Sequence, residues 1–287
     1  MLSVTGNPSL TSCWFSGNST CLLGGGLYVR DGEAVVVGCT FLGNRATNLA
    51  YGGGVATELS DVTFRNCLFV GNQADRGGGL YNRDSHSIVS NCTFSEHSSL
   101  EGRAVACDSN GEPSNVDLTN CILWDSGNET WKGGDSTIEI TYSDVHGGYL
   151  GEGCVYLDPE FVRIPHFGLD GIWGTADDDY GDLRLGPGSP CIKTGDPNFT
   201  PEPGETDLDG HFRLLCAIVD MGAYEFGIGD HDCDSEVDLD DFSSCFSCIT
   251  GPAGDPYIEG CQICDFDYDL DVDLFDLTGF QKAFTLK

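Results

Sequence analysis

The stretch Gly77-Gly78-Gly79-Leu80-Tyr81, followed by a polar turn and then by Ile88-Val89-Ser90-Asn91-Cys92-Thr93-Phe94, decides the fold because both of its phrases recur. The glycine phrase returns at residues 24–28, 52–55 and, more weakly, 102–105. The cysteine phrase returns at intervals of 25 to 29 residues, at Cys13, Cys39, Cys67, Cys92 and Cys121. A repeat of this length predicts a solenoid, in which each repeat contacts its neighbours.

The residues around each cysteine predict short strands that meet at a corner. Apolar side chains stand three residues before the cysteine and two residues after it, as Val89 and Phe94 do around Cys92. An odd step reverses the face of a strand, so the chain has to turn between Val89 and Cys92 for both side chains to face inward. Glycine and asparagine tolerate the left-handed backbone that such a corner needs. The residues directly before the five cysteines are Ser12, Gly38, Asn66, Asn91 and Asn120.

Together these strands predict an all-β solenoid, a parallel β-helix. A second strand begins at each glycine phrase, and stacked turns place equivalent residues in columns about 4.8 Å apart. One interior column holds the five cysteines, and another holds Phe15, Phe41, Phe69, Phe94 and Leu123. A cysteine column invites a disulfide or metal interpretation, but parallel Cβ vectors give poor disulfide geometry. We expect free, buried thiols that act as small apolar fillers.

The charge of the chain excludes several classes of partner. Its 287 residues carry 13 Lys and Arg against 46 Asp and Glu, for a formal net charge of −33. Binding to nucleic acid or to an anionic membrane surface rests on basic groups, so we expect neither. No stretch is apolar enough to predict a membrane span. The acidic balance favours divalent cations.

The first residues predict a protein longer than this chain. Residues 1–5 lack the basic start and apolar run of a secretion signal, and Cys13 already belongs to a repeat. A solenoid needs a cap over its terminal turn. We therefore expect further sequence upstream that includes a secretion signal, and a location outside the cell or on its surface.

Four later segments carry a family resemblance: Thr141–Val145, Leu157–Val162, Leu183–Ile192 and Val219–Phe226. They resemble secreted right-handed parallel β-helix proteins of planctomycete type, which share the pectate-lyase-like architecture. The resemblance covers residues 1–227 and implies an all-β right-handed parallel β-helix. The sequence predicts irregular loops at about 165–213 and a closing strand at 219–226. The resemblance implies no particular activity, because one fold hosts many functions.

Two twelve-residue acidic loops near the C-terminus predict calcium sites. Each has acidic residues at positions 1, 3, 5, 9 and 12 and an apolar residue at position 8. Calcium takes six to eight oxygen ligands, and this spacing brings the carboxylates and the carbonyl of position 7 around one ion. The acidic residues of the two loops are Asp230, Asp232, Asp234, Glu236, Asp238 and Asp241, and Asp265, Asp267, Asp269, Asp271, Asp273 and Asp276.

The paired loops resemble a type I dockerin. The resemblance implies a small α-helical, EF-hand-like domain over residues 228–287 that binds two calcium ions and docks onto a cohesin-like or other cell-surface protein. Position 6 departs from the glycine of EF-hand-like loops, since it is Ser235 and Leu270. Positions 10 and 11, Leu239-Asp240 and Leu274-Phe275, differ from the Ser/Thr pairs of many cellulosomal dockerins. A cellulosome partner is therefore not implied.

Five cysteines crowd into the same region, where a small domain benefits from disulfides. They are Cys233, Cys245, Cys248, Cys261 and Cys264, and the sequence alone leaves their connectivity open. We expect the pair Cys248–Cys261, because both residues flank the same Gly- and Pro-rich loop.

A third acidic loop lies at residues 170–179. Its carboxylates, Asp170, Asp177, Asp178 and Asp179, are candidate ligands for a third calcium ion. The alternative is a solvated turn, which acidic glycine-rich loops often are.

The candidate catalytic residues are Asp31, Asp84 and Asp108, which we expect in one column beside Arg30 and Arg83. Stacked aspartates can bind calcium or flank a glycosidic bond. The alternative, which we favour, is a surface ladder of ion pairs that adds little stability. No Ser/His/Asp, HExxH or phosphate-loop motif is present.

Three functions fit the sequence. The leading hypothesis is a calcium-binding β-helix protein with a structural, adhesive or scaffold role, because the repeats are regular and no turn stands out chemically. The second is a polysaccharide lyase or glycoside hydrolase of β-helix type. The third is a carbohydrate-binding protein without catalysis, in which the outward-facing Tyr28 and Tyr81 would stack on sugars.

Overall fold

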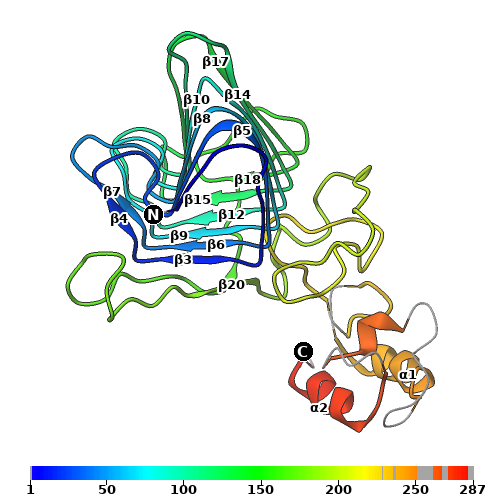
Figure 1. Cartoon of the computed structure of the whole chain (residues 1–287). Coiled ribbons are helices and arrows are strands. Elements are labelled where there is room, and N and C mark those ends of the chain that lie inside the picture. The colour runs from blue at the N-terminus through cyan, green and yellow to red at the C-terminus, as the bar shows by residue number, and fades with distance from the viewer. Residues whose placement is uncertain (1, 228, 235–236, 251–260, 267–270, 284–287) are drawn as a thin grey trace.

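The computed structural model describes residues 2–227, 229–234, 237–250, 261–266 and 271–283. It is a parallel β-helix of about five turns with a small helical region to one side (Figure 1). The ten-stranded sheet contains β1 (Leu2–Val4), β2 (Ser9–Thr11), β5 (Leu27–Val37), β8 (Val55–Arg65), β10 (Leu80–Arg83), β11 (His86–Ser90), β13 (Val105–Asp108), β14 (Ser114–Thr119), β16 (Thr130–Lys132) and β17 (Ser136–Thr141). The six-stranded sheet contains β3 (Trp14–Ser16), β6 (Thr40–Leu42), β9 (Leu68–Val70), β12 (Thr93–Ser95), β15 (Ile122–Trp124) and β18 (Asp144–Val145), and β4 (Ser19–Thr20) pairs with β7 (Arg45–Ala46).

The corner between the two sheets is the predicted one. The residue before each cysteine has a left-handed backbone, with φ of 50° at Ser12, 60° at Gly38, 53° at Asn66, 52° at Asn91 and 55° at Asn120. This conformation suits glycine and asparagine and is costly for most other residues. The corner lets both flanking apolar side chains face the interior.

The interior columns are also confirmed. Consecutive phenylalanine rings stack with centroids 4.9 Å apart for Phe15 and Phe41, 4.8 Å for Phe41 and Phe69, and 4.4 Å for Phe69 and Phe94. Four of the five column cysteines are fully buried, and all five are free thiols. Their sulfurs lie close to backbone carbonyls, as between Cys92 Sγ and Ser90 O at 3.1 Å. The thiols are thus packing groups of the core.

A second interior ladder, which the sequence analysis missed, is polar. The backbone N–H of Asn18 donates to Asn44 Oδ1 at 3.1 Å, and that of Asn44 donates to Asn72 Oδ1 at 3.0 Å. The ladder continues through His97 and Asp125, whose side chains accept the N–H of the preceding member at 3.0 and 2.6 Å. Each buried amide at this corner is thereby paired, as a polar group in a core requires.

Residues after the regular turns wrap the outside of the six-stranded sheet. β19 (Phe161–Arg163) pairs antiparallel with β20 (Asp182–Leu185), and most of 165–213 is irregular, as predicted. The predicted closing strand at 219–226 is wrong, because this segment forms no strand. It is nevertheless buried: Met221 packs against Ile122, and the Gly222 N–H donates to Asn120 O at 2.8 Å. Its backbone N–H groups donate to side chains and to carbonyls at the corners of the solenoid rather than to a neighbouring strand.

The C-terminal region has a core of its own. It contains α1 (Leu239–Ser247), a single 3₁₀ turn η1 (Gln262–Cys264) and α2 (Leu274–Ala283). Cys245–Cys264 and the predicted Cys248–Cys261 disulfide lie among its buried apolar residues. A third disulfide, Cys216–Cys233, crosses from the wrapping segment into this region. These bonds indicate an oxidising environment. No helix in the described part of the chain is long and apolar enough to cross a bilayer.

Candidate metal centre

The first acidic loop gathers its carboxylates at one point. Oxygen atoms of Asp230, Asp232 and Asp234 all lie within 4.8 Å of one another. Asp230 is fully buried, and its Oδ1 accepts the backbone N–H of Asp234 at 3.0 Å. Desolvation, with the neighbouring carboxylates, raises the pKa of Asp232. Repulsion among these groups is what a divalent cation would relieve.

The last three positions of the loop belong to the first turn of α1. Asp238, at position 9, is the N-cap of α1, and its side chain accepts the N–H of Asp240 at 2.9 Å. Asp241, at position 12, is buried and accepts the N–H of His231 at 2.7 Å on Oδ1 and that of Asp238 at 2.8 Å on Oδ2. The capping bonds thus fold the loop back over its own last carboxylate.

The second loop repeats this pattern position by position. Asp276, at position 12, accepts the N–H of Phe266 at 2.6 Å and of Asp273 at 2.6 Å, and Asp273 accepts the N–H of Phe275 at 2.6 Å. Oxygen atoms of Asp271, Asp273 and Asp276 lie within 4.8 Å of one another, and all three residues are buried. The two loops therefore share this bonding pattern, although the clustered carboxylates stand at positions 1, 3 and 5 in the first loop and at positions 7, 9 and 12 in the second.

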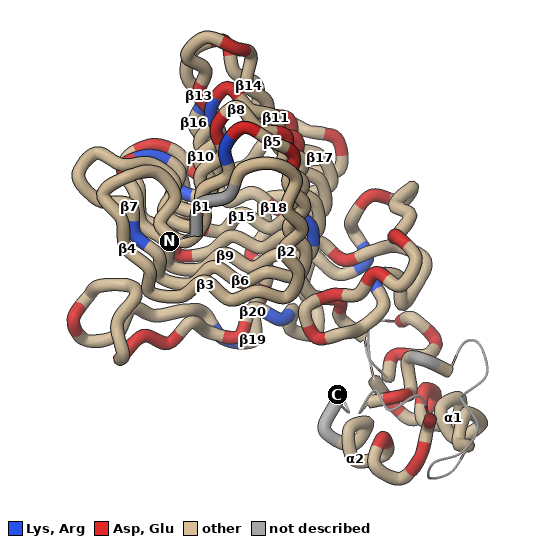
Figure 2. Tube along the Cα trace, viewed as in Figure 1, with Lys and Arg blue, Asp and Glu red and all other residues tan. Residues whose placement is uncertain are grey.

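The apolar residues at position 8 hold the two loops on one core. Val237 and Val272 are 2% and 3% exposed and belong to the same buried cluster as the disulfide cysteines. Figure 2 shows Asp and Glu gathered around α1 and α2. Buried, clustered carboxylate oxygens are the ligands that a hard divalent cation such as calcium selects, so the residues present fit the predicted metal. Three of the predicted ligands, Glu236, Asp267 and Asp269, lie outside the described residues, and Asp265 is buried at position 1 of its loop.

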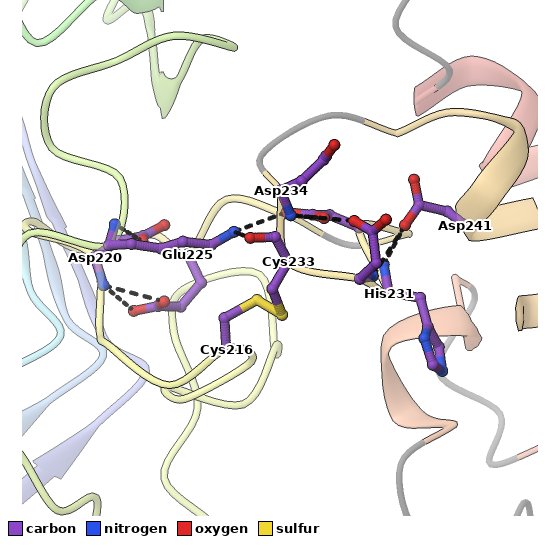
Figure 3. The surroundings of a disulfide bond; sticks show 10 residues. Cys216, Asp220, Glu225, His231, Cys233, Asp234 and Asp241 are labelled. Carbon is purple, nitrogen blue, oxygen red and sulfur yellow. Dashed lines mark hydrogen bonds and ion pairs between the residues drawn. A yellow bond between two sulfur atoms is a disulfide. The ribbon is translucent and has the colours of Figure 1, made fainter.

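The first loop is tied to the β-helix (Figure 3). Cys233, at position 4, forms the disulfide with Cys216 of the wrapping segment. Lys193, also from the wrapping segment, places its ammonium 3.0 Å from Asp230 Oδ2. Neither contact had a signal in the sequence, because Cys216 and Lys193 belong neither to a repeat nor to the loop motif.

The predicted third calcium loop is arranged differently. Asp177 Oδ2 accepts the N–H of Leu169 at 2.7 Å, and Asp178 Oδ2 accepts that of Gly174 at 2.7 Å. Asp179 is paired with Arg163, and Asp170 accepts the N–H of Ile172 at 2.9 Å. Among the described residues, these four aspartates do not form a group of potential ligands within 4.8 Å of one another. Each carboxylate instead shapes its own turn.

A group that the sequence analysis did not single out consists of Asp207, Asp209 and His211, whose potential ligand atoms lie within 4.8 Å. The alternating Asp-x-Asp-x-His spacing is the sequence pattern that could have indicated this group. Asp207 is already engaged, since it accepts backbone N–H groups from Asp209, His211 and Glu225 at 2.8 to 2.9 Å. These bonds give the group a structural role in the turn.

The candidate catalytic aspartates do not share one column. The strand register pairs Arg83 with Asp108, so Asp108 stands in the arginine column and the expected alignment with Asp84 is wrong by one residue. Asp108 accepts bonds from Arg76 at 3.2 Å and from the Tyr81 hydroxyl at 3.1 Å. Asp84 Oδ1 accepts the N–H of Asn110 at 2.6 Å, and Asp31 pairs with its neighbour Arg30 at 3.1 Å.

The aromatic column of the same face is covered. Tyr81 points outward but is only 1% exposed, because the Tyr51 ring packs against it at a tilt of 36°, with the ring centroids 4.8 Å apart. Arg76 lies over the rings of Tyr51 and Trp131, at 5.4 and 4.3 Å from their centroids. Tyr28 is half-buried and donates its hydroxyl proton to Glu58. The side chains on this face are bonded to one another.

Comparison with known proteins agrees with this fold. A family model described as a right-handed beta helix region matches residues 1–156. Metabotropic glutamate receptor-like protein R of Dictyostelium discoideum is 29% identical over 108 residues, which cover 37% of this chain and 6% of that protein. The chain thus spans a small part of that relative's length. No solved structure matches the chain significantly. The matched family model extends over more than half of the chain and coincides with the stacked parallel turns, so the protein belongs to the right-handed β-helix family.

Proposed function

We propose that this chain is a calcium-binding β-helix protein of the extracellular space or cell surface with a structural or adhesive role. In this proposal, residues 228–287 form a dockerin-like module that binds two calcium ions and docks onto a partner. The observation that carries the proposal is the repeated bonding pattern of the two acidic loops, in which position 12 accepts the N–H groups of positions 2 and 9.

The charge balance of the module supports a metal-dependent fold. Residues 228–287 contain 15 Asp and Glu against two Lys. A bound calcium ion in each loop would neutralise part of this charge and hold together the carboxylates of that loop. The chain would hold these ions through the Asp230 group in the first loop and the Asp271 group in the second.

Exposed apolar side chains support docking by the same module. Leu239 and Leu274 occupy position 10 of the two loops and are 68% and 75% exposed, and Phe275 beside them is 72% exposed. Large apolar groups at the start of each helix offer a hydrophobic contact for a cohesin-like or other cell-surface protein.

A calcium titration tests the proposal. Calorimetry on the calcium-depleted chain should report two ions bound, and circular dichroism should report a more ordered helical region after binding. Asp232→Asn, at position 3 of the first loop, should abolish one of the two binding events. Asp240→Asn, at the exposed position 11, is the matched control and should retain both. Absence of calcium binding by the folded chain would contradict the proposal.

One groove favours a second candidate function, carbohydrate binding. A cavity of about 560 Å³ lies between the outer face of the six-stranded sheet and the wrapping segment. Trp14, 74% exposed, lies at one side, and Arg184 is held by Asp209 through two bonds of 2.6 and 2.7 Å. Aromatic rings beside paired polar groups suit a sugar.

The charge of this groove points to neutral sugars. Its acidic lining consists of Asp182, Glu205, Asp207 and Asp209, against the single basic residue Arg184. Such a lining repels acidic polysaccharides such as polyuronates, so the groove does not support the polysaccharide lyase hypothesis. Binding of neutral oligosaccharides that quenches tryptophan fluorescence and is lost in Trp14→Ala would support this function, and unchanged binding in Trp14→Ala would contradict it.

A further inference from the structure

Lys193 reaches the first acidic loop from a firmly held part of the wrapping segment. Its backbone N–H donates to Asp220 Oδ1 at 2.7 Å, and its φ of 54° is left-handed. The neighbouring Cys191 is fully buried and its carbonyl accepts the N–H of Met221 at 3.0 Å. The base of the lysine is therefore part of the packed flank of the β-helix.

The ammonium of Lys193 lies against the carboxylate at position 1 of the first loop. It is 3.0 Å from Asp230 Oδ2 and 2.5 Å from the carbonyl oxygen of Cys233. The Lys193 side chain is 19% exposed and that of Asp230 is 0% exposed, so solvent screens this ion pair little. The other oxygen of Asp230 accepts the Asp234 N–H at 3.0 Å. A cation that ligates Asp230 Oδ2 thus meets a positive charge already bonded to it.

The disulfide keeps this cation close to the loop. Cys233, whose carbonyl bonds Lys193, is covalently joined to Cys216. Such a tether gives the lysine a high effective concentration at the loop. The disulfides beside the second loop, Cys245–Cys264 and Cys248–Cys261, both lie within the C-terminal region. The disulfide tether to the β-helix is therefore attached at the first loop.

We infer that Lys193 is a tethered competitor of calcium at Asp230. When the first loop binds a cation, this competition weakens the contact between the module and the β-helix. The inference rests on the proposed function, since it assigns a regulator to the same calcium site. Two sites coupled in this way influence each other by the same factor. Calcium at the first loop loosens the Lys193–Asp230 pair, and the intact pair lowers the calcium affinity of that loop.

The test isolates the first loop. In a background of Asp271→Asn and Asp273→Asn, which disables the second loop, calcium is titrated by calorimetry into the chain with and without Lys193→Met. Removing the ammonium should tighten calcium binding on the order of 5- to 150-fold, the usual range for coupled sites. Lys193→Arg, which keeps the charge, and Lys132→Met, at an exposed lysine on β16, should leave the affinity close to that of the parent.

A second readout distinguishes competition from a general change in stability. Hydrogen exchange of residues 191–195 should rise when calcium binds to the parent chain and should be independent of calcium in Lys193→Met. Calcium binding with equal affinity in the parent and in Lys193→Met would overturn the inference and leave the proposed function standing. Absence of calcium binding in the chain with both loops intact would overturn the proposed function, and the inference with it.

Discussion

His97 Nδ1 accepts the backbone N–H of Asn72 at 3.0 Å, in the place where Asn44 and Asn72 offer an amide oxygen to the turn before them. An acceptor nitrogen carries no proton, so the imidazole of His97 is neutral with its proton on Nε2. Protonation of Nδ1 would set two N–H groups against each other inside the core. Protonation of His97 would therefore destabilise the ladder, which passes from the amides of Asn18, Asn44 and Asn72 to the carboxylate of Asp125 through this histidine.

Replacement of this histidine should alter the pH dependence of stability. Burial lowers the pKa of His97, against an opposing effect of Asp125. The folded state then binds the proton less well than the unfolded state. The contribution of His97 to the free energy of unfolding is therefore fully present above the unfolded pKa of about 6.5, and it is lost as the pH falls below that value. His97→Asn, which restores the ladder amide, should lose less stability between pH 7.5 and pH 5 in urea unfolding. An equal loss in both chains would contradict this account.

The next ladder member, Asp125, should respond in the opposite direction. Burial raises the pKa of Asp125 to about 7, with Glu129 adding to the effect and His97 opposing it. The folded state therefore holds a proton that the unfolded state releases, and the charged form destabilises the fold at high pH. Asp125→Asn keeps an oxygen for the His97 N–H and should raise the unfolding free energy by ~1–3 kcal/mol at pH 8. The gain should shrink as the pH falls toward 4; a constant gain across this range would contradict a titration effect.

The middle of the amide ladder should be its most sensitive point. Asn72 is fully buried, accepts the N–H of Asn44 and donates to Phe41 O at 2.8 Å. Asn72→Ala leaves these groups unpaired and should cost about 2–4 kcal/mol, since each buried unsatisfied group costs ~1–3 kcal/mol. Asn18→Ala, at the more exposed end of the ladder, is the matched control and should cost less. Chemical denaturation measures both, and equal losses would mean that ladder position is unimportant.

The Cys216–Cys233 disulfide should govern how the helical region stays attached. In Cys216→Ser/Cys233→Ser, the two internal disulfides remain, but the first acidic loop keeps only noncovalent contacts with the wrapping segment. We expect proteolysis around residues 227–234 to become several-fold faster, because local opening no longer has to strain a covalent link. The variant Cys21→Ser, at an exposed free thiol, is the control and should be cut like the parent. Equal cleavage rates in all three chains would show that the noncovalent contacts suffice.

Much of the solenoid was predictable because its repeats carry their own geometry. The cysteine interval predicted the turns, and Asn66, Asn91 and Asn120 predicted the left-handed corner. The amide ladder had a readable signal as well, since Asn18, Asn44 and Asn72 each follow a column cysteine by five residues. In the next repeat, His97 replaces the asparagine at this position, so the pattern was not recognised. Asp108 was misplaced although the glycine phrases carried the signal, since Asp108 follows Gly102 by six residues as Arg83 follows Gly77, and the register of β10 with β13 pairs these two residues.

The contacts that position the candidate metal centre could not be predicted in the same way. Lys193 and Cys216 come from a segment without repeats, and each meets a residue 17 or more positions away. The ligand positions of the acidic loops could be predicted, because calcium binding requires acidic residues at a fixed spacing within a twelve-residue loop. Nothing in that spacing indicates which surface the loops pack against. The same holds for residues 219–226, where alternating apolar residues predicted a strand and the structure uses them to cover the outside of a sheet.

The buried thiol column also imposes an order on oxidative folding. Six cysteines form disulfides and nine remain reduced, and burial raises the pKa of Cys39 to about 12 and that of Cys92 well above its usual value. Thiol–disulfide exchange proceeds through the thiolate, so these two cysteines do not react in exchange once the turns have stacked. Before stacking, each is a rival partner for the C-terminal pairs. Correct oxidation therefore favours a nascent chain whose N-terminal turns close first, and a chain delayed in stacking would scramble its bonds.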